Sequence, residues 1–200
     1  MFRKASKFSY LAALKGIATH HDPDSSIEML FSSDDGNTWS EAKTVYKSAY
    51  GVNDPAITVL RNGRILVRFV ALQITKSENY QDLGQKIFSH RTEHSLVTNV
   101  VGNIVIASDD AGQTWNEIGL DNIETLGPSC SRDPILECDD GTLIMPVYTG
   151  APQRSDECWV IRSFDGGINW GACVKVASDP NGESSQLQGV NYNECSIVDL

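Results

Sequence analysis

The chain has 200 residues, of which 40% are hydrophobic and 21% are charged, and its formal net charge is −10. This length suits one domain, or two, with a sizeable buried core. The negative charge counts against nucleic acid or an anionic membrane as a partner, and no apolar run approaches the length of a transmembrane helix.

The start of the chain faintly resembles a secretory signal. Basic residues at positions 3 and 4 precede an apolar stretch at 8–14, but Lys15 interrupts it and no clear small-residue cleavage site follows. We therefore predict no signal peptide and leave the compartment open. The five cysteines form no CxxC pair, which favours buried free thiols over a zinc ribbon or a redox motif.

One eight-residue pattern, S-x-D-x-G-x-[TN]-W, occurs three times, at 32–39, 108–115 and 163–170. Each copy follows a run typical of a β-strand, at 27–31, 103–107 and 158–162. The glycine allows a backbone with φ > 0, the aspartate can accept hydrogen bonds from N–H groups of the turn, and the tryptophan begins the return strand. We predict three hairpin turns that join outer strands, in preference to a metal site built on the aspartates.

A second repeat alternates with the first. Residues 53–67 and 132–146 each read as an acidic residue, a proline, a short apolar strand, an Asn-Gly or Asp-Gly turn and a second apolar strand, and 193–200 begins a third copy. Together the two repeats predict four-stranded propeller blades. Blade two spans about 53–120 and blade three about 130–178. An incomplete blade one occupies 5–47, and 193–200 opens blade four.

Two connecting segments are rich in polar residues. The first, 73–98, is predicted to be a surface insertion within blade two, and the second, 178–189, a loop between blades. Three blades would form about half of a six-bladed ring, and a blade needs neighbours on both faces. We therefore expect the sequence to be part of a longer chain, and expect exposed strand edges to favour association of the isolated piece.

Candidate functional residues lie where each innermost strand begins, because these positions converge at one end of a propeller's central channel. They are Asn53 and Asp54, Arg132 and Asp133, and Asn193 and Glu194. Two alternatives remain open. The Asp-Pro pairs can simply turn the chain, and Arg132 can form a structural ion pair with Asp133 or Asp54.

The three turns resemble the Asp-box of sialidases and of other Asp-box propellers. Gly127-Pro128 followed by 140–148 resembles the sialidase run G-P-x…(D)-G-x-L-x-x-P-x-Y, and 193–200, NECSIVDL, is similar to the sialidase segment N-E-C/P-x-V-V-E-L. The resemblance covers essentially the whole chain. It implies an all-β Asp-box β-propeller of the six-bladed sialidase type, here about three blades long.

The resemblance also implies an activity, the release of terminal sialic acid with retention. A carboxylate nucleophile would be repelled by the substrate's own carboxylate, and sialidases use a tyrosine instead. Glu194 matches the glutamate that takes the tyrosine's proton. The general acid is an aspartate shortly before the first Asp-box, where Asp22 is our choice over Asp24. The mechanism requires no cofactor and no metal.

Some features of the sialidase pattern are missing. There is no R-[IV]-P motif, and the other carboxylate-binding arginines and the tyrosine belong to later blades that this sequence does not contain. Arg132 matches none of these arginines. We therefore expect the 200 residues alone to be inactive. The expected partner is a sialylated glycan or another oligosaccharide. The competing functions are an Asp-box glycosidase for a neutral sugar and a non-catalytic propeller that binds glycans or proteins.

Overall fold

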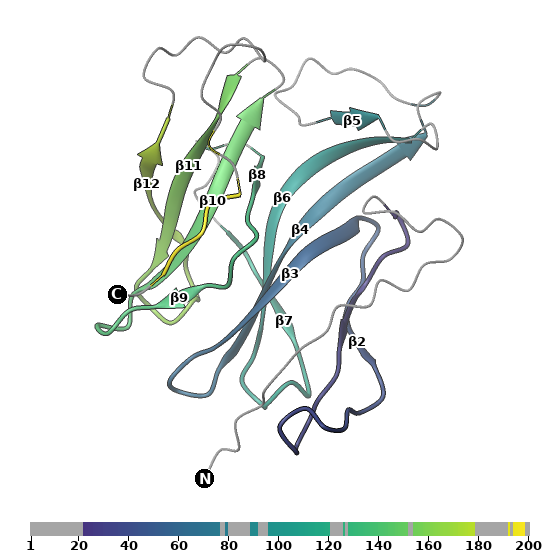
Figure 1. The fold of residues 1–200 in the computed structure, drawn as a ribbon, viewed down its shortest axis with the longest axis vertical. Coiled ribbons are helices and arrows are strands. Elements are labelled where there is room, and N and C mark those ends of the chain that lie inside the picture. Colours follow the sequence, from purple (N-terminus) through teal and green to yellow (C-terminus); the bar gives the residue numbers. More distant parts are fainter. Residues whose placement is uncertain are drawn as a thin grey trace.

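The computed structural model describes residues 22–76, 79, 89–91, 96–120, 126, 128–151, 154–178, 192 and 194–198. Within these ranges the chain is all-β, with three antiparallel sheets (Figure 1). Blade one is the pair β1 (Ile27–Met29) and β2 (Lys43–Tyr46). Blade two runs in the order β3 (Gly51–Val59), β4 (Ile65–Lys76), β6 (Leu96–Ser108) and β7 (Asn116–Ile118), with β5 (Ser89–Arg91) also paired to β6.

Blade three has the same order but a divided first strand. β8 (Ser129–Cys130) and β9 (Leu136–Glu137) both pair with β10 (Leu143–Ala151), which is followed by β11 (Arg154–Ser163) and β12 (Gly171–Ala177). The sheets stand side by side, with no closed ring (Figure 1). The chain is thus a partial β-propeller, which confirms the predicted fold class.

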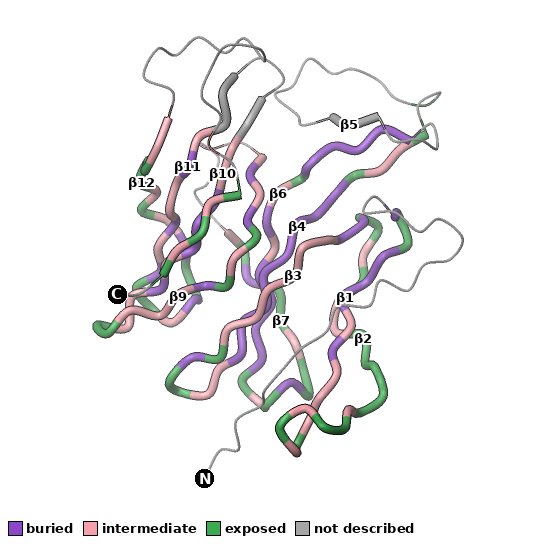
Figure 2. The backbone as a smooth tube through the Cα atoms, in the orientation of Figure 1, coloured by how far each residue is buried: buried purple, intermediate pink, exposed green. Residues whose placement is uncertain are grey.

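The core lies between the blades, and β4 contributes side chains to it from both of its faces. Its side chains alternate in direction, as in any strand. Leu66 belongs to the apolar cluster shared with blade three, whereas Val67 and Phe69 belong to the cluster shared with blade one. Figure 2 accordingly shows β4 buried along most of its length. A strand covered on both faces requires a nearly continuous apolar run, and in β4 only Arg68 interrupts the run from Ile65 to Leu72.

The three S-x-D-x-G-x-[TN]-W turns fold alike. In the first, the Ser32 hydroxyl donates to Asp34 at 2.8 Å and accepts from the Gly36 N–H at 2.8 Å, and Thr38 donates to Asp34 through both its N–H and its hydroxyl. The other two turns repeat this pattern. Each tryptophan indole donates to the glycine carbonyl at 3.1–3.2 Å. The predicted hairpin turns are confirmed, and both aspartate oxygens are used within the turn.

The innermost strands of blades two and three are interrupted at their Asp-Pro pairs. In β3 the register shifts between Asn53 and Ala56, so Asp54 and Pro55 lie outside the ladder. In blade three the residues between β8 and β9, which include Asp133-Pro134, are likewise unpaired with β10. Proline has no N–H to donate, so each pair breaks the strand and frees backbone carbonyls.

The prediction for 73–98 was wrong at both ends. Residues 73–76 extend β4, and their ladder partners at 96–99 extend β6. Thr98 and Asn99 are buried despite being polar, because the sheet continues through them. The rest of the segment, except 79 and 89–91, lies outside the described residues, as do residues 1–21 and 179–191. No helix in the described part of the chain is long and apolar enough to cross a membrane.

Candidate functional site

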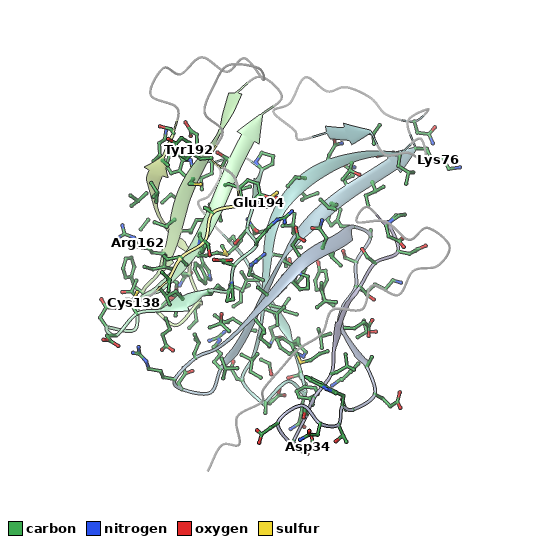
Figure 3. All side chains as sticks on the ribbon, viewed as in Figure 1. Asp34, Lys76, Cys138, Arg162, Tyr192 and Glu194 are labelled. Carbon is green, nitrogen blue, oxygen red and sulfur yellow. The ribbon has the colours of Figure 1, made fainter. Side chains whose placement is uncertain are left out.

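Arg132 stands between two carboxylates contributed by other parts of the chain. Its Nη2 lies 3.1 Å from Oε1 of Glu194, and its Nε lies 3.8 Å from Oδ2 of Asp54. Figure 3 shows Glu194 between the sheets of blades two and three, far from Asp34 in the first turn. The predicted residues Arg132, Asp54 and Glu194 therefore converge, and the ion pair with Asp54, one of the two predicted alternatives, is present. Their predicted place at strand starts was wrong, because Asp54 lies within β3, Arg132 lies between β8 and β9, and the described residues 194–198 form no strand.

The Arg132–Glu194 pair is open to solvent. The side chains of Arg132 and Glu194 are 47% and 53% exposed, whereas that of Asp54 is 25% exposed. Such an exposed pair adds little to stability, about 0–1 kcal/mol. Its groups are instead accessible to a ligand.

Tyr148 adjoins this cluster. It lies on β10, paired with Cys130 of β8, and close enough to Arg132 for the two side chains to shift each other's pKa. Burial raises the pKa of Tyr148, with a further contribution from Cys130, and Arg132 only partly opposes the rise. Burial alone would lower the pKa of Arg132, but Asp54, Tyr148 and Glu194 outweigh it and raise that pKa. The site thus presents a neutral phenol beside a permanent cation.

Backbone geometry orients the two carboxylates. Asp54 and Glu194 have φ values of 49° and 51°, in the left-handed region that non-glycine residues rarely adopt. They occupy corresponding positions in the second repeat. Such conformations cost about 1–3 kcal/mol each and cluster at functional sites. Here they occur at the two residues whose carboxylates meet Arg132.

Arg68 lies beneath the cluster and is fully buried. Its Nε donates to the Asp133 carbonyl at 2.6 Å, and its Nη1 donates to the carbonyls of Asp54, at 2.7 Å, and Ser131. Its Nη2 is buried without a hydrogen-bond partner. Burial lowers the pKa of Arg68 to about 10, with Asp54 and Asp133 opposing the shift, so the side chain remains charged at neutral pH.

Asp133 is engaged in a different contact. Its Oδ2 accepts hydrogen bonds from the Ser196 hydroxyl and from the Ile197 N–H, the latter at 3.0 Å. The Asp133 carboxylate therefore fixes the segment that follows Glu194 instead of facing Arg132. The Asn53 side chain lies nearby in the β3 sequence, and its Oδ1 is buried without a hydrogen-bond partner.

Asp22 is buried at the boundary between blades one and two. Its Oδ1 accepts from the Asp24 N–H at 2.8 Å, and its Oδ2 is buried without a hydrogen-bond partner. The Ser25 hydroxyl donates to the Asp22 carbonyl and accepts from the Val52 N–H, which ties this loop to β3. Among the described residues, no hydrogen bond or ion pair connects Asp22 to Arg132 or Glu194.

Sequence reasoning missed Arg68 and Tyr148 as parts of the site. The signal for Arg68 was a lone charge within the apolar run ILVRFVAL of β4. Tyr148 was noticed only as the end of the P-x-Y match. No disulfide joins the five cysteines. Cys158 is buried and the other four are partly buried, so the expectation of buried thiols holds for only one of them.

The cluster of Arg132, Glu194, Asp54 and Tyr148 offers a carboxylate that can accept a proton, a guanidinium that can bind oxygen atoms, and a phenol that can donate a hydrogen bond. These groups suit a polyhydroxylated ligand. Within the described ranges, no group of three or more His, Cys, Asp and Glu residues is arranged to hold a metal ion.

Solved structures with the same fold include sialidases. The chain matches a protein of unknown function from Dyadobacter fermentans with a TM-score of 0.62 and 21% identity, over 81% of this chain and 46% of that one. It matches a Hadza microbial sialidase with a TM-score of 0.54 and 20% identity, over 77% and 32%. It matches the Trypanosoma rangeli sialidase in complex with 2,3-difluorosialic acid, a covalent intermediate, with a TM-score of 0.52 and 17% identity. That match covers 81% of this chain and 27% of the sialidase.

These likenesses show a sialidase-like β-propeller fold. The chain spans less than half of the length of each of these proteins. Comparisons with protein-family models and with curated proteins find no match.

Proposed function

We propose that this chain forms part of a glycoside hydrolase of the sialidase type, which releases terminal sialic acid from glycoconjugates. The observation that carries the proposal is that Arg132 meets the carboxylates of Asp54 and Glu194, with one residue from each copy of the second repeat, in a sialidase-like propeller. That the Trypanosoma rangeli sialidase forms a covalent intermediate with a sialic acid derivative supports the substrate class.

In this proposal Glu194 acts as the base that takes the proton of a tyrosine nucleophile. Its Oε1 lies 3.1 Å from Nη2 of Arg132, which holds the carboxylate in place. Tyr148 is assigned a different role, because burial raises its pKa and keeps the phenol able to donate a hydrogen bond. It donates a hydrogen bond to the substrate instead. In the sialidases that the sequence resembles, the nucleophilic tyrosine belongs to a later blade.

Asp22 is the proposed general acid. Its Oδ2 has no hydrogen-bond partner, so that oxygen is uncommitted within the protein. Ser25 holds this loop against β3 by accepting a hydrogen bond from the N–H of Val52, which is two residues before Asp54. Asn53 and Asp133 are further proposed substrate-binding residues. Asp133 acts indirectly, through the segment at 196–197 that its carboxylate holds in place.

A second candidate is a related glycosidase that acts on a neutral sugar. Its support is that Arg132 already contacts two carboxylates, so the cluster of Arg132, Asp54 and Glu194 has a net charge of −1. A cation neutralised in this way attracts a substrate carboxylate less strongly than a free one. Neutral hydroxyl groups suit such a site equally well.

Hydrolysis of a fluorogenic α-sialoside by the complete protein of which this chain is proposed to form part, compared with a panel of neutral fluorogenic glycosides, separates the candidates. We expect sialoside turnover that falls at least a hundredfold in Glu194→Gln. Glu41→Gln is the matched control, because Glu41 is exposed and belongs to the first turn region. Turnover of a neutral glycoside alone would favour the second candidate. If Glu194→Gln retained full activity, the role of Glu194 would be wrong.

A further inference from the structure

The interrupted ladders of the inner strands leave backbone carbonyls without strand partners directly beneath the site. Because Asp54-Pro55 and Asp133-Pro134 leave their ladders, the carbonyls of Asp54, Ser131 and Asp133 lack strand partners. A buried carbonyl without a donor costs about 1–3 kcal/mol. Some other group must therefore hold these two stretches, which belong to different blades.

Arg68 is that group. It leaves β4 on the face that packs against blade three and donates to all three carbonyls. Two of them, on Ser131 and Asp133, flank Arg132 in sequence, and the third belongs to Asp54. A planar guanidinium with five donors can serve both strands at once, whereas a lysine ammonium has three donors on a single atom.

A purely stabilising role explains this arrangement poorly. Arg68 is fully buried, and among the described residues it forms hydrogen bonds only with carbonyls and leaves Nη2 without a partner. Burying a charge without a hydrogen-bonded carboxylate is costly. Hydrophobic packing would join the blades more cheaply, as the apolar cluster shared by blades two and three does a few residues away.

We propose that Arg68 is a positioning residue of the site. By holding the backbone on both sides of Arg132 and at Asp54, it places the Arg132 guanidinium between the carboxylates of Asp54 and Glu194. The inference deepens the proposed function and rests on it for catalysis. The other half of the inference, that Arg68 aligns the two inner strands, depends only on its three hydrogen bonds and not on the proposed function.

Two variants of Arg68 test this role, Arg68→Lys and Arg68→Gln, which keep some of the donors and reduce the risk of misfolding. Thr58→Val is the matched control. The Thr58 hydroxyl also crosses between the blades, donating to the Ile135 carbonyl at 2.7 Å, but it contacts none of the site residues. The first readout is amide hydrogen exchange of the full chain, followed by mass spectrometry of peptides covering 52–56 and 131–135.

We expect exchange at least tenfold faster in both peptides of the Arg68 variants, with blade one unchanged, and no such paired effect in Thr58→Val. Unchanged exchange in both peptides, or an equal increase throughout the chain, would overturn the proposal. This readout needs no activity, so it remains decisive if no glycoside is hydrolysed.

The second readout is the kcat and KM of the substrate found in the turnover assay. Arg68→Lys should lose at least tenfold in kcat/KM while keeping its far-UV circular dichroism spectrum, and Thr58→Val should stay within twofold of the original chain. Equal losses in Arg68→Lys and Thr58→Val would show that Arg68 only joins the blades, and would refute a positioning role.

Discussion

Trp170 and Trp39 occupy the same position in two copies of one turn motif. Comparing their replacement therefore measures how much packing between blades contributes to the free energy of unfolding. Both end an S-x-D-x-G-x-[TN]-W turn before its return strand, and both donate the indole N–H to a turn glycine carbonyl, at 3.2 and 3.1 Å. They differ in surroundings. Trp170 is 2% exposed and belongs to the cluster between blades two and three, whereas Trp39 is only partly buried.

Replacing each residue with alanine removes the same hydrogen bond but different amounts of buried surface. A fully buried tryptophan covers about 150–250 Å² and its loss costs about 3–5 kcal/mol. For Trp39, with part of that area already in water, we expect about half as much. With a denaturant slope of about 2 kcal/mol per molar urea, Trp170→Ala should lower the unfolding midpoint by about 2 M and Trp39→Ala by about 1 M.

Urea unfolding followed by far-UV circular dichroism is the appropriate assay, because removing a tryptophan alters the fluorescence signal itself. Trp170→Phe, which keeps an aromatic ring, provides an intermediate point and protects against complete unfolding of the alanine variant. Equal midpoints for Trp170→Ala and Trp39→Ala would refute the reasoning, since the turns alone would then account for the whole effect.

Two further predictions concern the turns. Hydrogen bonds from Thr38 and Ser32 hold the pKa of Asp34 at about 2, below the value of about 4 expected in the unfolded chain, so its contribution to stability is complete above pH 4 or so and is lost as the pH falls toward 2. The difference in urea midpoint between the original chain and Asp34→Asn should therefore be larger at pH 7 than at pH 2.5, and a constant difference would contradict the assignment. Gly63→Ala should cost about 1–2 kcal/mol for its φ of 90°. Gly112→Ala should cost measurably more in the same unfolding assay, because Gly112 has a φ of 86° and an added Cβ would also lie 2.9 Å from Phe31 Cζ. Equal costs for the two variants would show that Phe31 moves aside freely.

The turns and inner hairpins could be predicted from sequence because their causes are local. Every hydrogen bond that defines an S-x-D-x-G-x-[TN]-W turn lies within eight residues, and the Asn62-Gly63 turn closes within five, from Leu60 to Arg64. The strand extensions at 73–76 and 96–99 were missed because polar residues there are buried by distant pairing, which no local pattern reveals.

The candidate site was predictable only in part. The second repeat predicted that Asp54, Arg132 and Glu194 start equivalent strands, and hence that they converge. Which groups would pair was not evident, because Asp133 and Arg132 are neighbours in sequence yet turn to different partners. The role of Arg68 depends on carbonyls more than sixty residues away along the chain, at Ser131 and Asp133.

The Asp-Pro interruptions have a consequence for solubility as well as for the site. β3 is the terminal strand of its sheet, and β8 and β9 form the corresponding edge of the next. A straight edge of this kind exposes a row of amide donors and acceptors that a foreign strand can extend into an aggregate. A proline and a bulge in the middle of each edge remove a donor and bend the row. The Asp54-Pro55 pair, which places a carboxylate at the site, and the Asp133-Pro134 pair therefore each protect an inner edge against unwanted strand pairing.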